Sequence, residues 1–278
     1  MNKVIKKSFS VAFAITTGIL TFAPESAFSR IQILKKVTGD WNAAINRIIL
    51  LIIVYIVSLI VTLLYYYYRR SISIKGRNYC IKVQYGNILK TDVIKNLILG
   101  KKCWRVISFD ECFTTSIGNE KWQINEDSIC GQYLKKYPII NMQQLINTAG
   151  LTPCVNRSKF QNSICYASGS IIPKDGFFLM AFAKLNQDGL GEISYKEYLE
   201  CLNLLWSEIN NYYGQKDVYI SIIGSGVTRM NDIELTTQEL LDTIIYSYKL
   251  SRNKIKLPSK LHIVCRKKDG VSLDDICG

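Results

Sequence analysis

An uninterrupted apolar segment, Ile48–Tyr68 (IILLIIVYIVSLIVTLLYYYY), limits what this chain can fold into more than any other feature. It contains no charged residue, proline or glycine, and Arg47 and Arg69 flank it. As an α-helix it would be roughly 30 Å long, which matches the thickness of a bilayer core. Its four terminal tyrosines, followed by Arg69 and Arg70, are typical of a membrane interface. We therefore expect a transmembrane helix here, and not the buried core helix of a soluble protein.

A second and shorter apolar stretch, Ser8–Pro24, follows a lysine-rich start. One interpretation is a first transmembrane helix that forms a hairpin with the helix at 48–68. The other is a cleaved signal peptide, with the small residues around Ala27–Ser29 as the cleavage site. Both remain open, so the membrane region, residues 1–70, is predicted to hold one or two transmembrane helices, at 8–24 and 48–68.

Either interpretation places residues 71–278 on the cytoplasmic side of the membrane. The basic residues Arg69, Arg70, Lys75 and Arg77 agree with the positive-inside bias, whereas Lys35, Lys36 and Arg47 count against it. All nine cysteines follow the membrane segment and none forms a C-x-x-C pair, which is typical of a reducing compartment. We expect a single-pass or multi-pass membrane protein whose C-terminal domain is cytoplasmic.

The formal net charge of the chain is +13, which suits an anionic partner. No motif that interleaves arginine with aromatic residues, as RNA-binding proteins use, is visible. Lipid headgroups and a small anionic ligand are therefore expected as partners, and nucleic acid is not.

Residues 71–278 show strand and helix patterns in alternation, after a short linker at 71–78. Strands are expected at 79–85, 104–109, 177–182, 217–223 and 261–265, and helices at 128–136, 142–149, 194–212 and 236–250. A polar loop is expected at 110–125. This order predicts an α/β domain with a mostly buried sheet and helices on both faces.

A glycine turn, Gly224-Ser225-Gly226, follows the apolar strand 217–223. At the carboxyl end of a buried strand, such a turn lets backbone N–H groups approach a phosphate. Thr228 and Arg229 could add a hydroxyl and a guanidinium. The spacing fits neither the Rossmann fingerprint nor the P-loop nor the nucleophile elbow.

Two other features carry weaker signals. Asn186–Glu197 imitates an EF-hand loop, but Leu190 offers no side-chain oxygen at the fifth position, so a turn into a capped helix is favoured over calcium binding. The single histidine, His262, lies within a predicted strand, and a triad with Ser225 is not expected. We predict no catalytic residue and no metal site.

Several phrases of the chain resemble one protein family across residues 79–265. They are VQYGNILK, FDECF, ICGQYL, SKFQN, FFLMAFAKL, EYLECL, IIGSGVTR and IIYSYKLS. These resemble the macro domain of membrane-anchored effectors of Thoeris anti-phage defence. The resemblance implies a three-layer α/β sandwich with a mixed central sheet.

The resemblance also implies a ligand site built from three segments. The expected ligand-binding residues are Gly86, Asn87 and Ile88 in the first, Phe109, Asp110, Ser116, Ile117 and Gly118 in the second, and Gly224, Ser225, Gly226, Val227, Thr228 and Arg229 in the third. Asn87 stands where many macro domains have an aspartate that contacts adenine. Asp110 and its neighbours replace the asparagine-rich loop of hydrolytic macro domains, which argues for a sensor and against a hydrolase.

The resemblance implies a mechanism in a bacterial cell membrane. A partner TIR-domain protein makes an ADP-ribose derivative, and the macro domain binds this nucleotide signal. The effector then assembles as a homo-oligomer and disrupts the lipid bilayer, which leads to cell death or growth arrest, the outcome called abortive infection. No cofactor is expected apart from the signal. The alternatives are a membrane-tethered ADP-ribosyl or nucleotide hydrolase, or an anchored binding module without a small ligand.

Overall fold

The computed structural model describes residues 2–22, 24, 26, 40–90, 103–226 and 228–276. The chain divides into two compact units, Met1–Arg70 and Ser71–Gly278.

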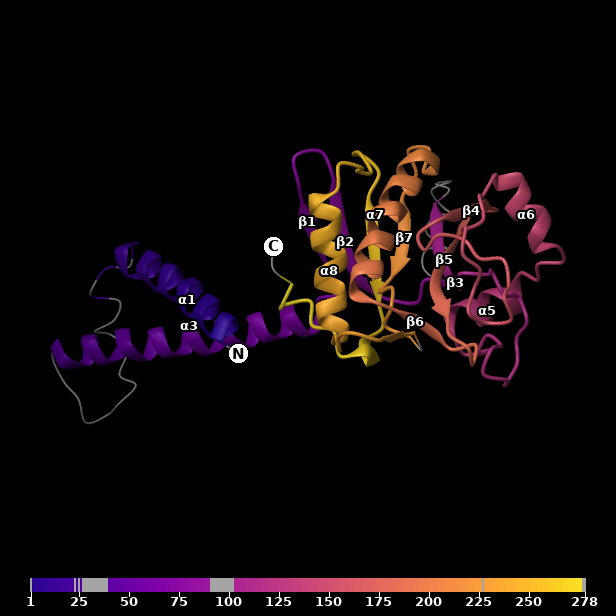
Figure 1. Cartoon of the computed structure of the whole chain (residues 1–278). Helices are drawn as coiled ribbons and strands as arrows, with labels where there is room; N and C mark the ends of the chain where they lie inside the picture. Colours follow the sequence, from indigo (N-terminus) through magenta and orange to yellow (C-terminus); the bar gives the residue numbers. More distant parts are fainter. Residues whose placement is uncertain are drawn as a thin grey trace. The chain divides into compact units, whose positions relative to one another are not determined.

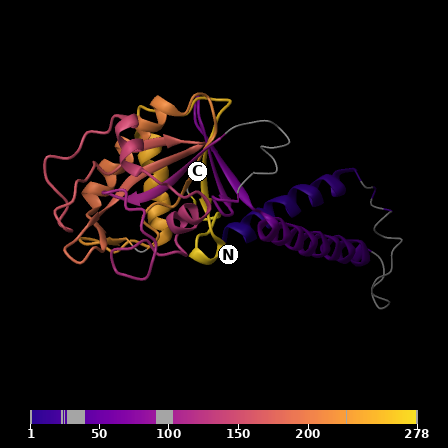
Figure 2. The same ribbon diagram turned by 90° about the vertical axis from the view of Figure 1, so that its right-hand side faces the viewer.

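The first unit contains two helices, α1 (Asn2–Phe22) and α3 (Asp40–Tyr68). They lie next to each other in both views (Figures 1 and 2). The Ser58 hydroxyl of α3 donates a 3.0 Å hydrogen bond to the Ser8 carbonyl of α1, and the rings of Phe9 and Tyr55 meet edge to face at 6.2 Å. A polar hydrogen bond between two apolar helices fixes which residues face each other.

The outer faces of these helices are strongly apolar. Phe13, Ile53 and Val61 are among the large hydrophobic side chains exposed there. Within the described residues, one stretch, Ala44–Tyr65 of α3, is long and apolar enough to cross a membrane, and the apolar part of α1, Ser8–Phe22, is shorter. An apolar surface of this extent on the helix pair is compatible with lipid contact.

The second unit is built on a nine-stranded mixed sheet (Figure 1). The strands are β1 (Ser71–Lys75), β2 (Cys80–Tyr85), β3 (Trp104–Asp110), β4 (Ile171–Lys174), β5 (Phe177–Leu185), β6 (Gly191–Ile193), β7 (Val218–Ser221), β8 (Arg229–Met230) and β9 (Leu261–Cys265). Their order is β1-β2-β9-β7-β3-β5-β6-β8, and β4 pairs with β5. The five strands β2, β9, β7, β3 and β5 run parallel. β1 is antiparallel to β2, and β4 and β6 are antiparallel to β5, while β8 runs parallel to β6.

Helices cover both faces of this sheet, which confirms the predicted three-layer α/β architecture. The helices α7 (Tyr195–Tyr212) and α8 (Thr237–Leu250) share one hydrophobic cluster with the sheet. The helices α5 (Ile129–Lys136) and α6 (Met142–Ala149) share another. A short 3₁₀ helix, η1 (Lys267–Asp269), follows β9.

The strand β5 explains how one apolar run serves both layers. Successive side chains of a strand point to opposite faces. Phe178 and Met180 accordingly belong to the cluster beneath α7 and α8, while Phe177 and Leu179 belong to the cluster beneath α5 and α6. The continuous run predicted a strand buried on both faces, and the structure confirms it.

The start of α7 is fixed by its capping box. The Ser194 side chain accepts from the Glu197 backbone N–H, and the Glu197 carboxylate accepts from the Ser194 backbone N–H. The preceding EF-hand-like segment closes the β5–β6 hairpin, because the Asn186 side-chain oxygen accepts from the N–H groups of Asp188 and Leu190 at 3.0 Å each. A turn into a capped helix was expected here, and the structure has one.

Three boundaries differ by two or more residues from the sequence-based expectation, and one of them is the strand expected at 177–182, which continues to Leu185. The predicted linker 71–78 is wrong over its first five residues, which form β1 in antiparallel register with β2. Ile72 and Ile74 alternate with serines and face Val83 and Ile81 across the hairpin, which is the pattern of an edge strand. The strand expected at 217–223 ends at Ser221, because the chain turns after it.

Candidate functional site

The parallel strands bring three distant segments to one edge of the sheet. Carboxyl ends of parallel strands meet at the same edge, where α/β proteins bind their ligands. Gly86–Ile88 follow β2, Asp110 ends β3, and Gly224–Gly226 follow β7 by way of Ile222 and Ile223. The sequence-predicted segments therefore share this carboxyl edge.

A cavity of about 40 Å³ lies between the ends of β2, β7 and β9. It is lined by Gly86, Asn87, Ile88, Ile129, Gln132, Ser221, Ile222, Ser225, Val264, Arg266 and Asp269. Four of these, Gly86, Asn87, Ile88 and Ser225, were predicted as site residues. A space of this size encloses one or two water-sized groups, so a nucleotide bound here would extend outside it along the edge.

Arg266 supplies the cationic group of this cavity. Its Nε donates to Asp269 Oδ2 at 3.1 Å. A guanidinium has five N–H donors, and this contact uses one of them. Sequence reasoning missed Arg266, although it comes directly after the predicted strand 261–265 and therefore at the edge where a ligand is expected.

The first predicted segment forms a tight turn. Asn87 Oδ1 accepts from the Leu89 N–H at 2.9 Å, which leaves the two amide donors of Asn87 for a ligand. Gly86 donates its N–H to the Cys265 carbonyl at 2.9 Å, which ties the turn to the end of β9. The Ile88 side chain is buried in a small core cluster, and Ile88 joins this cluster to the cavity lining.

The glycine turn is anchored by hydrogen bonds to the two residues before it, and Gly226 is exposed to solvent. The buried Tyr198 hydroxyl donates to the Ile223 carbonyl at 2.9 Å, and the Ser225 hydroxyl donates to the Ile222 carbonyl at 2.7 Å. Gly224 has a φ of 87°, a conformation that favours glycine. At Gly226, by contrast, an added Cβ would meet no atom within 4 Å among the described residues beyond its chain neighbours. Val227 lies outside the described residues.

The residues after this turn lead away from the cavity. They form the short strand β8, in which Arg229 pairs in register with Glu192 of β6, and α8 begins only at Thr237. Thr228 and Arg229 therefore do not line the cavity. A phosphate at the turn would meet peptide N–H groups without a helix N-terminus behind them.

The second predicted segment also lies outside the cavity lining. The Phe109 ring is buried against Phe113 and Tyr133. Asp110 Oδ1 accepts from the N–H groups of Cys112 at 2.8 Å and Thr114 at 3.2 Å. Burial raises the pKa of the Asp110 carboxyl, and the Thr114 hydrogen bonds oppose that shift.

The loop beyond Asp110 folds back on itself. Ser116 Oγ accepts from the Gln123 side-chain amide at 3.2 Å, and Ile117 pairs with Ile124. Gly118 continues this pairing by donating its N–H to the Ile124 carbonyl at 3.3 Å. None of the residues 116–118 lines the cavity.

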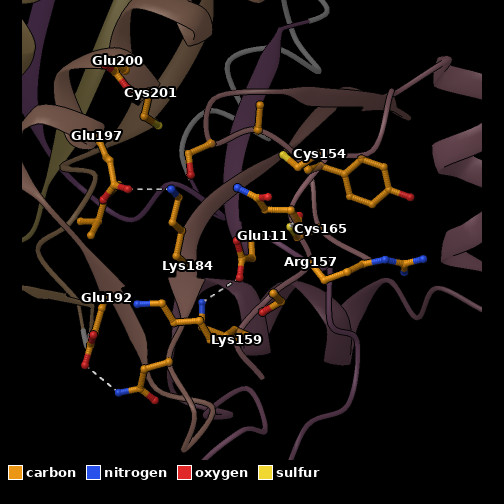
Figure 3. Close-up of a pocket in the computed structure, with 18 of the residues that line it drawn as sticks. Glu111, Cys154, Arg157, Lys159, Cys165, Lys184, Glu192, Glu197, Glu200 and Cys201 are labelled. Carbon is orange, nitrogen blue, oxygen red and sulfur yellow. Dashed lines mark hydrogen bonds and ion pairs between the residues drawn. The ribbon is translucent and has the colours of Figure 1, made fainter. Parts of the chain in front are cut away.

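A larger cavity of about 740 Å³ lies at the same edge, beside the ends of β3 and β5 (Figure 3). Glu111, the residue after Asp110, lines it together with Lys184 and Glu197. None of the sequence-predicted site residues that the structure describes lines this pocket. The residues that line this pocket come from segments that are far apart in the sequence, so no local sequence pattern predicts it.

His262 lies at the other end of the strands. Its Nε2 is 3.3 Å from Asp217 Oδ2, and its ring stacks on Tyr219 at 4.2 Å between centroids. Both contacts are near the amino ends of β7 and β9. The histidine is thus remote from Ser225, and the two do not form a catalytic pair.

Comparison with known proteins identifies the family. The family described as "Thoeris protein ThsA, Macro domain" matches residues 81–266. The chain is also similar to the Thoeris protein ThsA of Bacillus amyloliquefaciens (strain Y2), with 30% identity over 174 residues. That alignment covers 60% of this chain and 58% of the relative, so the chain spans less than two thirds of the relative's length. The matched region contains the strands from β3 to β9, β2 from its second residue, and all of the residues that line the two cavities except Asp269. The chain therefore belongs to the family of ThsA macro domains.

Proposed function

We propose that this chain is a membrane-anchored effector of Thoeris anti-phage defence, whose macro domain binds an ADP-ribose derivative made by a TIR-domain protein. The observation that carries the proposal is that Gly86 and Asn87 meet the segment after β7 around one cavity. That segment contributes Ser221, Ile222 and Ser225, and Arg266 also lines the cavity. These segments are far apart in the sequence and are joined only by the parallel strands β2, β9 and β7.

Each part of such a ligand has a suitable partner at the edge. The Asn87 amide can donate to and accept from an adenine. The Ser225 N–H already donates to the Ile222 carbonyl at 3.3 Å, so the N–H groups of Gly224 and Gly226, together with the Arg266 guanidinium, are the donors proposed for a diphosphate. Asp110, at the end of the neighbouring strand, would then lie beside the distal ribose.

The surroundings of Asp110 favour binding over turnover. Its Oδ1 accepts hydrogen bonds from two backbone N–H groups. This oxygen therefore stabilises the turn and does not act as a base that activates a water. The protein is proposed to be a sensor that releases its ligand unchanged.

The response is proposed to occur in the bilayer. The apolar helix α3, with or without α1, would anchor the chain in the bacterial cell membrane, with the macro domain in the cytoplasm and Arg69 and Arg70 at the interface. A ligand that favours one of two arrangements of the protein shifts the population toward it. Here the favoured arrangement would be a homo-oligomer that damages the membrane and halts the infected cell.

A binding experiment on the full-length chain in detergent tests the proposal. The purified product of a TIR enzyme, added at about 100 times its Kd, should stabilise the folded state by about 2.7 kcal/mol. This corresponds to a rise in Tm of about 5–10 °C. Chromatography should recover the ligand intact, and inorganic pyrophosphate serves as the control for unspecific anion binding. An unchanged Tm with the product and with ADP-ribose would contradict ligand binding, and consumption of the ligand would instead support the hydrolase.

A further inference from the structure

One end of the mixed sheet carries a basic surface that contains no acidic residue. Two segments form it: β1 with the turn that follows, residues 71–79, and the second half of α8 with the loop to β9, residues 243–260. Neither segment contains an aspartate or a glutamate. Together they contain seven basic residues: Lys75, Arg77, Lys249, Arg252, Lys254, Lys256 and Lys260. We call this surface the basic edge.

The two segments meet at the amino ends of the parallel strands. The Leu257 N–H donates to the Asn78 carbonyl at 3.2 Å, which joins the loop before β9 to the turn between β1 and β2. Lys75 pairs in register with Cys80, the first residue of β2, and Lys260 directly precedes β9. Figure 1 shows the turn and the loop at the same end of the sheet. The basic edge is therefore one surface, at the end of the strands opposite to the candidate ligand site.

Most of the charge on this surface is available to an anionic partner. Lys75, Arg77, Arg252 and Lys256 are exposed, and within the described part of the chain none of the four forms an ion pair. Lys254 has a structural role instead, because its Nζ donates to the last carbonyls of α8 and the residue after it. Four positive charges thus face solvent with no acidic side chain in either segment to offset them.

Exposed apolar side chains stand among these charges. Leu250, the last residue of α8, is 83% exposed, and Leu257 is 47% exposed. Tyr246 is also exposed, and Lys249 Nζ lies 5.4 Å from the centroid of its ring. Lysine and arginine beside leucine and tyrosine are typical of surfaces that bind the headgroup region of a bilayer. The phosphates of a nucleic acid would satisfy the charges but would leave these leucines in water.

We propose that the basic edge docks on the anionic headgroups of the membrane, with Leu250 and Leu257 at the boundary between headgroups and acyl chains. The inference rests on the proposed function, because it requires that α3 anchors the chain in a bilayer. Lys75 follows Tyr68, the last residue of α3, by seven residues, so the chain can separate the two by no more than about 25 Å. The anchor therefore keeps the basic edge at a high local concentration near lipid.

Docking through the basic edge is compatible with ligand binding. No residue of the basic edge lines either of the two cavities at the carboxyl edge. A docked domain would therefore keep both cavities open to the cytoplasm, where the nucleotide signal is proposed to be made. Variants of the basic edge should accordingly bind the signal with the affinity of the wild type.

Photocrosslinking of the full-length chain in liposomes tests the proposal. Leu250→p-benzoylphenylalanine places a photoreactive group at this exposed position, and mass spectrometry of the irradiated protein measures lipid adducts there. Liposomes that contain the anionic lipid phosphatidylglycerol should give at least about fivefold more adduct than liposomes of phosphatidylcholine alone. Because each basic side chain strengthens binding to an anionic surface by about fivefold, Arg252→Gln together with Lys256→Gln should lower the adduct yield at least about fivefold.

Two controls keep the outcome decisive. Lys121→Gln together with Lys136→Gln removes the same charge from exposed positions outside the basic edge and should leave the yield unchanged. Ile53→p-benzoylphenylalanine reports on the anchor, because Ile53 is exposed on α3 and should form lipid adducts in both kinds of liposome. Equal adduct yields at position 250 in both liposomes, crosslinks there to a second copy of the chain, or no crosslinks would overturn the inference. Missing adducts at position 53 would instead contradict the membrane anchor of the proposed function.

Discussion

Gly226→Glu is expected to weaken binding of ADP-ribose and its derivatives by at least about 100-fold, with no loss of fold stability. Gly226 is exposed, and among the described residues beyond its chain neighbours an added Cβ would meet no atom within 4 Å, so a side chain can start there without a clash. Its carboxylate would stand where the diphosphate is proposed to bind. Two like charges about 4 Å apart repel by about 4 kcal/mol near a protein surface, which exceeds the loss that a 100-fold change requires. Calorimetric titration of the full-length chain measures the effect.

Two matched variants separate charge from bulk at this glycine. Gly226→Ala tests whether the backbone needs glycine and should retain binding. Gly226→Gln has the size of the glutamate without its charge, so its affinity should fall less than that of Gly226→Glu. Full affinity in the glutamate variant would place the phosphate elsewhere and contradict the assignment of the 224–226 turn.

Trp206→Ala should produce the largest loss of stability that we predict, about 3–5 kcal/mol. The Trp206 side chain is 1% exposed at the interface between α7 and α8. Its ring meets Tyr248 edge to face at 5.0 Å, and its Nε1 donates to the Ser247 hydroxyl at 3.1 Å. The substitution removes these contacts and leaves a cavity. Urea unfolding of the full-length chain, followed by far-ultraviolet circular dichroism, gives the change.

Leu199→Ala is the control for this prediction. Leu199 lies on the same helix, α7, but is exposed. Its replacement should therefore change the free energy of unfolding by no more than about 0.5 kcal/mol. A similar loss of unfolding free energy in Trp206→Ala and Leu199→Ala would contradict the claim that the α7–α8 interface stabilises this helical layer.

Periodicity and capping patterns predicted the long elements of the fold correctly. The apolar run of β5 and the capping boxes that begin α7 and α8 are local signals, and the structure has these elements where they were expected. The strands β1, β4, β6 and β8 were missed. They contain only two to five residues each, so their existence depends on the partners that the tertiary fold supplies.

The candidate site was only partly predictable for the same reason. Gly86, Asn87 and Ser225 follow strong strand signals, and the structure brings them to one cavity. Arg266 and Gln132 also line that cavity. Arg266 follows β9 and Gln132 lies in α5, and the position of both elements beside the cavity depends on the tertiary fold. Arg229 was predicted as part of the phosphate loop. In the structure it lies in β8, which pairs with β6 as the last strand in the sheet order, and it does not line the cavity.

The most direct test of the account uses the full-length chain in liposomes that contain a self-quenched dye. Addition of the ADP-ribose derivative made by a TIR enzyme should release the dye, whereas inorganic pyrophosphate should not, and liposomes with the Gly226→Glu variant should stay intact. Chromatography of the same samples should return the derivative unchanged. Intact liposomes in the presence of bound derivative, or dye release that does not depend on it, would contradict a ligand-gated membrane effector.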